Sequence, residues 1–271
     1  MTVHGSGGVY LTTPPSGGAA WGGMGGQLIL PPFDCSDPDF FPLRLGVDSA
    51  ENQNEGGAPA EPDVPDDLTV LLVFDKSGSM SSPWGGKSRW QAGSDAVLLG
   101  LDGILDALTI GAIFFPFDEA GTEFGCGVPG ITVAPQIDFD TGRAFKSAWI
   151  EGACSAQPDG STPLERAFLK ADEAITQAEE RSLIRERMRV ILVTDGEPTC
   201  GDSLESIVAF PRKWSERGIE THVIGLPGSS GGAELLTQIA QAGGTEDYFA
   251  PAGVGAIAIQ DLEEEVHHLL R

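Results

Sequence analysis

Three short stretches, far apart in this 271-residue chain, carry side chains whose oxygen atoms can bind a metal ion. They contain Asp75, Ser77 and Ser79 in the first stretch, Thr162 in the second and Asp195 in the third. Residues two apart in an extended segment face the same way, so the first stretch can present a carboxylate and two hydroxyls to a common point. Such hard oxygen ligands suit Mg²⁺ and are also compatible with Mn²⁺ or Ca²⁺. The sequence therefore predicts a divalent-cation site that leaves one coordination position open for a further anionic ligand.

The first and third stretches each follow an apolar run with the composition of a buried strand. Residues 68–74 are apolar on both faces and end at Asp75, and residues 189–194 end at Asp195. Continuous apolar runs of this kind fit parallel strands that helices cover on both sides. Because ligands of such sheets bind at the carboxyl ends of the strands, both aspartates are expected at the same edge.

From residue 68 onward, apolar runs alternate with stretches of helical periodicity. This alternation predicts an α/β fold, with a doubly wound (Rossmann-like), mostly parallel sheet and helices on both faces. Strands are expected at residues 68–74, 110–117, 189–194, 220–226 and 247–250, with a candidate edge strand at 131–133. Helices are expected at residues 89–108, 141–149, 164–186, 203–217, 233–242 and 254–270.

The first 67 residues differ from the rest of the chain. Glycine and proline recur through residues 1–47 without helical periodicity, which indicates an irregular N-terminal extension. Residues 48–67 are acidic and contain Asn, Gly and Pro, so we interpret them as a linker. Residues 68–271 are then expected to form one α/β domain.

The residues of the predicted cation site resemble the motif of a known family. The D-x-S-x-S run from Asp75 to Ser79, the distant Thr162 and the aspartate of the T-D-G sequence, Asp195, are similar to the metal-ion-dependent adhesion site (MIDAS) of von Willebrand factor type A (VWA) domains. The similarity extends over about residues 68–271 and is strongest to bacterial extracellular or cell-surface members. It implies that the serines and the threonine contact the ion directly or through water. The aspartates would either contact the ion themselves or bind the groups that contact it.

This resemblance implies a protein-binding module rather than an enzyme. In an adhesion or assembly function of this kind, the bound Mg²⁺ coordinates an acidic residue of a protein partner. One alternative is an intracellular scaffold for an AAA-type ATPase, as some family members are. Another is a hydrolase that uses the cation as a Lewis acid. The hydrolase is less favoured, because the sequence has no H-E-x-x-H motif and no recognisable base or nucleophile near the site.

Two other loop types do not fit the first stretch. An EF-hand loop that began at Asp75 would need a bidentate glutamate at its twelfth position, where Gly86 stands. A phosphate-binding loop that ended in the Gly-Lys-Ser sequence at 86–88 would need a glycine where Ser81 stands. Nucleotide binding is therefore not expected.

The cysteines leave two interpretations open. Four of them lie far apart and form no C-x-x-C pair: Cys35, Cys126, Cys154 and Cys200. This spacing argues against a zinc site and a thioredoxin-like motif. Two disulfides are one interpretation, with Cys126 and Cys154 as the favoured pair because both stand in the irregular segment between two predicted elements. Four separate buried thiols are the alternative. Cys200, just past Asp195, is in position to tether the rim of the site.

The charge and hydropathy of the chain limit its partners and location. Sixteen basic and forty acidic residues give a net charge of −24, which repels nucleic acid and anionic lipid surfaces. No apolar run reaches the roughly 18–20 residues of a membrane span, and the sequence as given shows no export signal at its start. The VWA resemblance nevertheless implies an extracellular or cell-surface protein, and disulfides would favour that location over an intracellular one.

Overall fold

A computed structural model describes residues 68–101, 104, 108–117, 126, 136–140, 142–252 and 256–270. The predicted N-terminal extension (1–47), the acidic linker (48–67) and the candidate edge strand at 131–133 lie outside these described residues.

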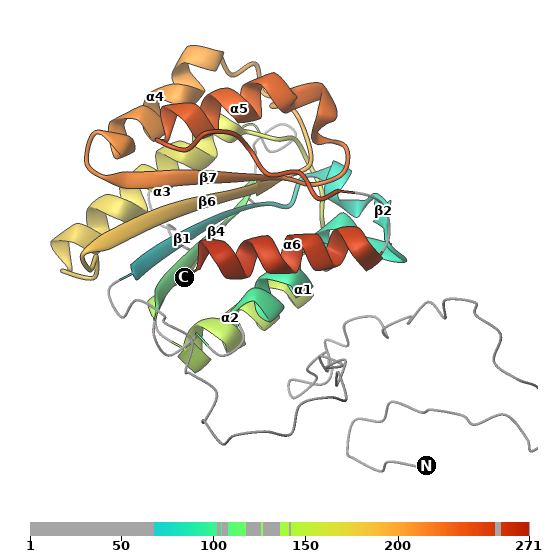
Figure 1. Ribbon diagram of the computed structural model, residues 1–271, viewed down its shortest axis with the longest axis horizontal. Coiled ribbons are helices and arrows are strands. Elements are labelled where there is room, and N and C mark those ends of the chain that lie inside the picture. Colours follow the sequence, from blue (N-terminus) through green and yellow to red (C-terminus); the bar gives the residue numbers. More distant parts are fainter. Residues whose placement is uncertain are drawn as a thin grey trace, which may run out of the picture. The chain divides into compact units, whose positions relative to one another are not determined.

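A five-stranded sheet forms the centre of the domain (Figure 1). Its strands follow the order β5-β4-β1-β6-β7, and all neighbouring pairs are parallel except β4 with β5. The strands are β1 (Leu68–Asp75), β4 (Thr109–Phe115), β5 (Ile137–Asp140), β6 (Arg187–Thr194) and β7 (Ile219–Gly225). A separate two-stranded hairpin consists of β2 (Pro83–Trp84) and β3 (Lys87–Ser88).

Helices cover both faces of the sheet, with α3, α4 and α5 on one side and α1, α2 and α6 on the other (Figure 1). Their bounds are α1 (Arg89–Gly100), α2 (Gly142–Ser155), α3 (Leu164–Glu180), α4 (Leu204–Ser215), α5 (Ala233–Ala242) and α6 (Ala256–Leu269). This arrangement confirms the predicted α/β class with its mostly parallel sheet.

The continuous apolar runs form the central strands because helices exclude water from both faces of the sheet. Every residue of β1 is buried, and so are the last five residues of β6, Val190–Thr194. On the side of α3, the apolar residues of the sheet pack against an alanine-rich helix stripe and against Phe168 and Trp214. Those two rings meet edge to face with centroids 5.5 Å apart. The two strands that lead to the predicted site therefore end within the buried centre of the sheet.

The start of α1 is fixed by a capping box. Ser88 accepts a hydrogen bond from the backbone N–H of Gln91, and the Gln91 side chain accepts one from the backbone N–H of Ser88. The two bonds satisfy backbone groups that the first helical turn would otherwise leave without partners. They also help to fix the position of Arg89, the first helical residue, whose backbone N–H donates to the Ser82 carbonyl (2.9 Å).

Some elements differ from the sequence-based prediction. Helix α3 ends at Glu180 instead of 186, because Ser182 takes a left-handed conformation (φ 57°) that stops it. Helix α2 is longer than predicted and runs to Ser155. The strand expected at residues 247–250 is reduced to a single parallel bridge between Phe249 and Ile224. Strand β5 and the β2–β3 hairpin were not predicted.

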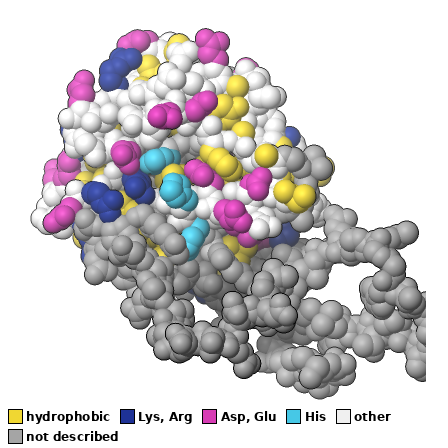
Figure 2. Space-filling model, in the orientation of Figure 1, with side chains coloured by type: hydrophobic (Ala, Val, Ile, Leu, Met, Phe, Trp, Pro, Cys, Tyr) yellow, Lys and Arg dark blue, Asp and Glu magenta, His cyan; other side chains and the backbone are white. Residues whose placement is uncertain are grey.

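The outer surface carries the negative charge of the sequence. Acidic side chains are spread over the face in Figure 2 and are not gathered into one patch. Within the described part of the chain, no helix is long and apolar enough to cross a membrane.

Candidate metal site

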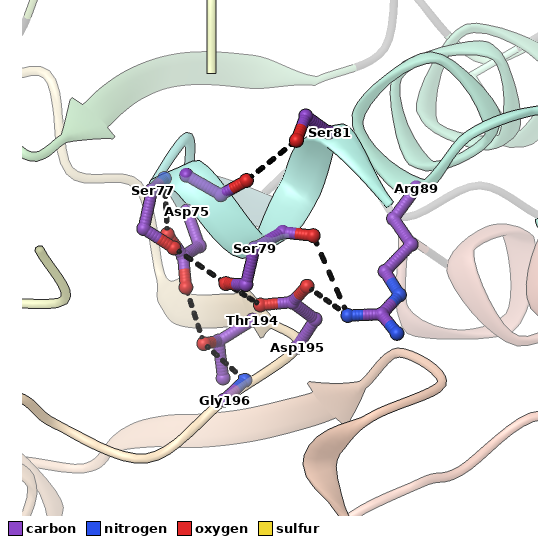
Figure 3. Close-up of polar contacts among 9 residues, drawn as sticks. Asp75, Ser77, Ser79, Ser81, Arg89, Thr194, Asp195 and Gly196 are labelled. Atoms are coloured by element: carbon purple, nitrogen blue, oxygen red, sulfur yellow. Dashed lines mark hydrogen bonds and ion pairs between the residues drawn. The ribbon is translucent and has the colours of Figure 1, made fainter. Parts of the chain in front are cut away.

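Asp75 stands at the end of β1 with both carboxylate oxygens bound (Figure 3). Oδ1 accepts a hydrogen bond of 2.7 Å from the backbone N–H of Ser77, and Oδ2 accepts one of 2.6 Å from the Thr194 hydroxyl. The side chain is fully buried. These contacts fix the orientation of Asp75 from two neighbouring strand ends.

Burial dominates the electrostatics of Asp75. Loss of hydration raises the pKa of this carboxyl to about 7, even though hydrogen bonds from Thr194 and Ser77 lower it. The nearby Asp195 raises the pKa of Asp75 further, because its negative charge disfavours a second negative charge on Asp75. A divalent cation placed here would reverse this balance, since it favours the ionised carboxylates.

Ser77, Ser79 and Asp195 form a continuous chain of oxygen atoms (Figure 3). The hydroxyl oxygens of Ser77 and Ser79 lie 3.0 Å apart, and the Ser79 hydroxyl donates a 2.6 Å hydrogen bond to Asp195 Oδ1. Adjacent ligands of an octahedral Mg²⁺, each about 2.0–2.1 Å from the ion, are roughly 2.9 Å from each other. The spacing of these three oxygens is within a few tenths of an ångström of that value, so it is compatible with adjacent Mg²⁺ ligands.

A short helical turn, Gly78–Ser81, follows Ser77 and carries Ser79, whose hydroxyl lies between that of Ser77 and the Asp195 carboxylate although Ser79 itself is exposed. Ser81, at the end of this turn, is exposed and donates its hydroxyl to the carbonyl of Gly78 (2.7 Å), away from Asp195. Ser77 is 1% exposed. The turn therefore separates the serines of the predicted site from a nearby serine that serves only the backbone.

Thr162 lies in an adjoining loop, against the turn that carries the serines. The backbone N–H of Gly78 donates to the carbonyl of Gly160 (3.0 Å), and the N–H of Asp159 donates to the carbonyl of Lys76 (2.9 Å). Thr162 itself is buried. Its hydroxyl makes no hydrogen bond to the other four predicted ligands, all of which are within the described residues. The structure thus joins four of the five into one network and places the fifth beside it.

The loop that follows β6 holds Thr162 from the other side. The backbone N–H of Thr162 donates to the hydroxyl of Thr199 (2.8 Å), and the N–H of Thr199 donates to the carbonyl of Thr162 (3.2 Å). Thr162 is therefore positioned by two loops, one after β1 and one after β6. Thr199 was not identified from the sequence, because its partner is 37 residues away in the chain.

The predicted pairing of Cys126 with Cys154 is wrong, since Cys126 forms a disulfide with Cys200. The prediction relied on both cysteines lying in one irregular segment, but Cys154 is part of α2. Cys126 is held near the start of α3 by Arg166, whose Nε donates to the Cys126 carbonyl (3.1 Å). Cys200 directly follows Thr199, which contacts Thr162 near the same helix end. The disulfide therefore tethers the rim of the site.

Arg89 is a second residue of the site, after Thr199, that was not identified from the sequence. Its Nη1 donates a 2.6 Å charged hydrogen bond to Asp195 Oδ2 and lies 3.4 Å from the carbonyl oxygen of Ser79 (Figure 3). Both oxygens of Asp195 are therefore bound, one by Ser79 and one by Arg89. No spacing rule connects Arg89 with Asp195, since they are 106 residues apart.

The strand order explains why these groups meet. After β1 the chain adds β4 and β5 on one side and then crosses back to place β6 on the other side. Such a reversal opens a crevice at the carboxyl ends of the two strands, where α/β sheets bind ligands. Asp75 ends β1 and Asp195 follows β6, as expected. In the described part of the chain, no cluster of three or more His, Cys, Asp or Glu side chains could hold a metal, so a cation here depends on hydroxyl ligands.

Comparison with solved structures identifies the type of fold. The sequence matches no protein-family model and no curated protein. Among solved structures, the pilus adhesin SpaC from Lactobacillus rhamnosus GG has a TM-score of 0.52 at 15% identity, over 78% of this chain and 31% of SpaC. The SpRpn10 VWA domain has a TM-score of 0.52 at 13% identity, over 73% of this chain and 94% of that domain.

A third structure is itself described as von Willebrand factor type A, from Catenulispora acidiphila. It has a TM-score of 0.51 at 16% identity, over 75% of this chain and 42% of its own length. The chain has the VWA fold. At these identities the likeness shows the fold alone, and the chain spans only about a third of SpaC. The VWA fold is therefore confirmed, and the assignment of the five residues as MIDAS ligands stays a prediction.

Proposed function

We propose that this VWA-fold chain is a divalent-cation-dependent protein-binding module for adhesion or assembly. Mg²⁺ would be held by Asp75, Ser77, Ser79, Thr162 and Asp195 and would coordinate a carboxylate of a protein partner. The observation that carries the proposal is the chain of oxygens from Ser77 through Ser79 to Asp195, whose separations of 3.0 and 2.6 Å suit adjacent ligands of Mg²⁺.

The chemistry of the ligand set supports a carboxylate as the partner group. The set contains only two carboxylates, and Arg89 already compensates the charge of one of them. A bound Mg²⁺ therefore keeps net positive charge and attracts a further anionic oxygen. In a chain with a net charge of −24, such an ion also offsets the repulsion that an acidic partner would otherwise meet.

An extracellular or cell-surface location is part of this proposal. The Cys126–Cys200 disulfide supports it, because disulfides persist in oxidising compartments and are rare in the cytosol. SpaC, which shares the fold, is a pilus adhesin. The disulfide makes an intracellular scaffold for an AAA-type ATPase the less favoured alternative.

Affinity capture tests the function directly. The immobilised chain is incubated with a surface-protein extract in MgCl₂ and eluted with EDTA, beside matched columns that carry Ser79→Ala and Ser81→Ala. We expect the same proteins to elute with EDTA from the wild-type and Ser81→Ala columns and to be absent from the Ser79→Ala column. Millimolar glutarate, a free dicarboxylate, should compete with them. Retention in EDTA, or equal capture by Ser79→Ala, would contradict a cation bridge.

A further inference from the structure

Arg89 brings a positive charge to the edge of the candidate metal site. It is the first residue of α1, and its guanidinium binds the carboxylate of Asp195 at 2.6 Å. The Asp195 side chain is fully buried, whereas 19% of the Arg89 side chain is exposed. A buried carboxylate without a compensating charge is strongly destabilising. Arg89 therefore supplies, from within the protein, a charge that Asp195 requires.

The surroundings of Arg89 are shaped for a guanidinium group. Gly228 has a φ of 111°, and a Cβ atom at this position would lie 2.7 Å from Arg89 Nη1 and 3.0 Å from Cζ. Only glycine leaves this space free. Arg89 Nε is buried, and it has no hydrogen-bond partner within the described residues. Because a buried donor without a partner is costly, the ion pair with Asp195 is the interaction that holds the guanidinium here.

We propose that Arg89 is a built-in counter-ion that takes the place of the divalent cation at Asp195 and thereby sets the cation affinity of the site. The inference rests on the proposed function, since it concerns the same five ligands. Arg89 and a bound cation would both interact with the carboxylate of Asp195. Its Oδ1 faces Ser79, and its Oδ2 faces the guanidinium. The affinity of an oxygen-ligand site depends on the charge of its ligands, and Arg89 cancels one unit of that charge.

Two consequences follow for the protein. Asp195 stays in place at low cation concentration, so the domain remains folded and the serines remain oriented. The site then fills only at a higher cation concentration than the same ligands would need without Arg89. Arg89 is thus a positioning and affinity-determining residue and is not itself a metal ligand.

Calorimetric titration with MgCl₂ and MnCl₂ and thermal unfolding in EDTA test this on the full chain. The neutral variant Arg89→Gln should bind the cations on the order of tenfold more tightly than wild type. It should unfold at a lower temperature in EDTA and recover in saturating Mg²⁺. Arg89→Lys keeps the charge and should stay within about threefold of the wild-type Kd. Arg181→Gln removes the same charge from an exposed ion pair with Asp138 and should leave the Kd unchanged.

Each result decides the proposal. An unchanged Kd in Arg89→Gln overturns it while leaving the cation-dependent function intact. An Arg89→Gln chain that stays unfolded in saturating Mg²⁺ also overturns it, because the cation should then replace the missing charge. If neither wild type nor Arg89→Gln binds a cation, both proposals fail. Binding by Arg89→Gln alone supports the role of Arg89 and contradicts the proposed function of the natural chain.

Discussion

At the scale of single residues, Thr194 holds Asp75 from behind the candidate site. Its hydroxyl donates a 2.6 Å hydrogen bond to Asp75 Oδ2, and both side chains are completely buried. A second strand threonine, Thr221 on β7, is equally buried, but its hydroxyl has no hydrogen-bond partner among the described residues. The Thr194 hydroxyl also accepts a long hydrogen bond from the Gly196 N–H (3.4 Å), so the two threonines form a matched pair that separates the effect of these hydrogen bonds from the effect of burial.

We expect Thr194→Val to lower the free energy of unfolding by about 1–3 kcal/mol, because Asp75 loses a donor where water cannot replace it. Valine has nearly the same shape as threonine, so packing is little changed. Thr221→Val should be neutral or slightly stabilising, since it removes a hydroxyl that makes no bond. Urea denaturation of the three proteins measures both effects. Equal losses in the two variants would show that the hydrogen bond is not the cause.

Residue types alone could predict the candidate ligands but not the groups that hold them. Asp75 and Asp195 follow apolar runs that mark strand ends, and that signal is local in the sequence. Arg89 and Thr199 act through contacts across 106 and 37 residues, and nothing in their immediate neighbours indicates those partners. Long-range partners of this kind depend on the packing of whole elements.

At the scale of elements, the disulfide connects Cys200, in the loop after β6, with Cys126, whose carbonyl is held by the side chain of Arg166 near the start of α3. In the same loop, Thr199 accepts a hydrogen bond from the backbone N–H of Thr162 and donates one to its carbonyl. The disulfide therefore restrains the one predicted ligand that is not hydrogen-bonded to the other four.

Replacing both cysteines, Cys126→Ser with Cys200→Ser, should lower the free energy of unfolding by about 2–4 kcal/mol. Cation affinity should also fall, because the loop that positions Thr162 gains freedom. A variant confines the change to this pair, whereas a reductant acts on all four cysteines. Thermal unfolding and calorimetry measure the two effects. An unchanged cation Kd would show that the tether serves stability alone.

The contact between α1 and α6 depends on a glycine. A Cβ atom on Gly100 would lie 2.5 Å from Val266 Cγ1 and 3.2 Å from the backbone nitrogen of His267. The His267 ring nitrogen Nδ1 also lies 2.8 Å from the Gly100 carbonyl oxygen. The two helices thus approach closely where no side chain intervenes.

Gly100→Ala should therefore lower the free energy of unfolding by about 1–3 kcal/mol, although alanine normally favours a helix. The overlap involves backbone as well as a side chain, so α6 would have to move. Gln177→Ala, an exposed change within α3, serves as the control and should be close to neutral. A stabilised Gly100→Ala protein would contradict the close approach of the helices.

The elements themselves were partly predictable. Long apolar runs identified β1 and β6, because burial on both faces leaves a clear signal. Strand β5 has only four residues, with alternate positions exposed, so its pattern was too short to detect. The disulfide pairing was mispredicted because sequence proximity was used where the fold brings a distant loop to the start of α3.

At the scale of the whole molecule, the order of the strands brings the ends of β1 and β6 together, and loop hydrogen bonds add Thr162 beside them. The net charge of −24 favours any cation near the surface, so general screening must be separated from binding at this site. Titrations at constant ionic strength, with NaCl replacing MgCl₂ in the control, distinguish specific binding of Mg²⁺ from general screening of the negative charge.

Calorimetric titration of the chain with MgCl₂ at constant ionic strength measures whether the proposed site binds the cation. We expect one saturable site in the wild type and in Ser81→Ala, because the Ser81 hydroxyl that this variant lacks donates only to the carbonyl of Gly78. In Ser79→Ala the site should be lost, because Ser79 connects Ser77 to Asp195 in the oxygen chain. Absence of saturable binding in the wild type, or equal binding in Ser79→Ala, would contradict a cation site formed by these residues.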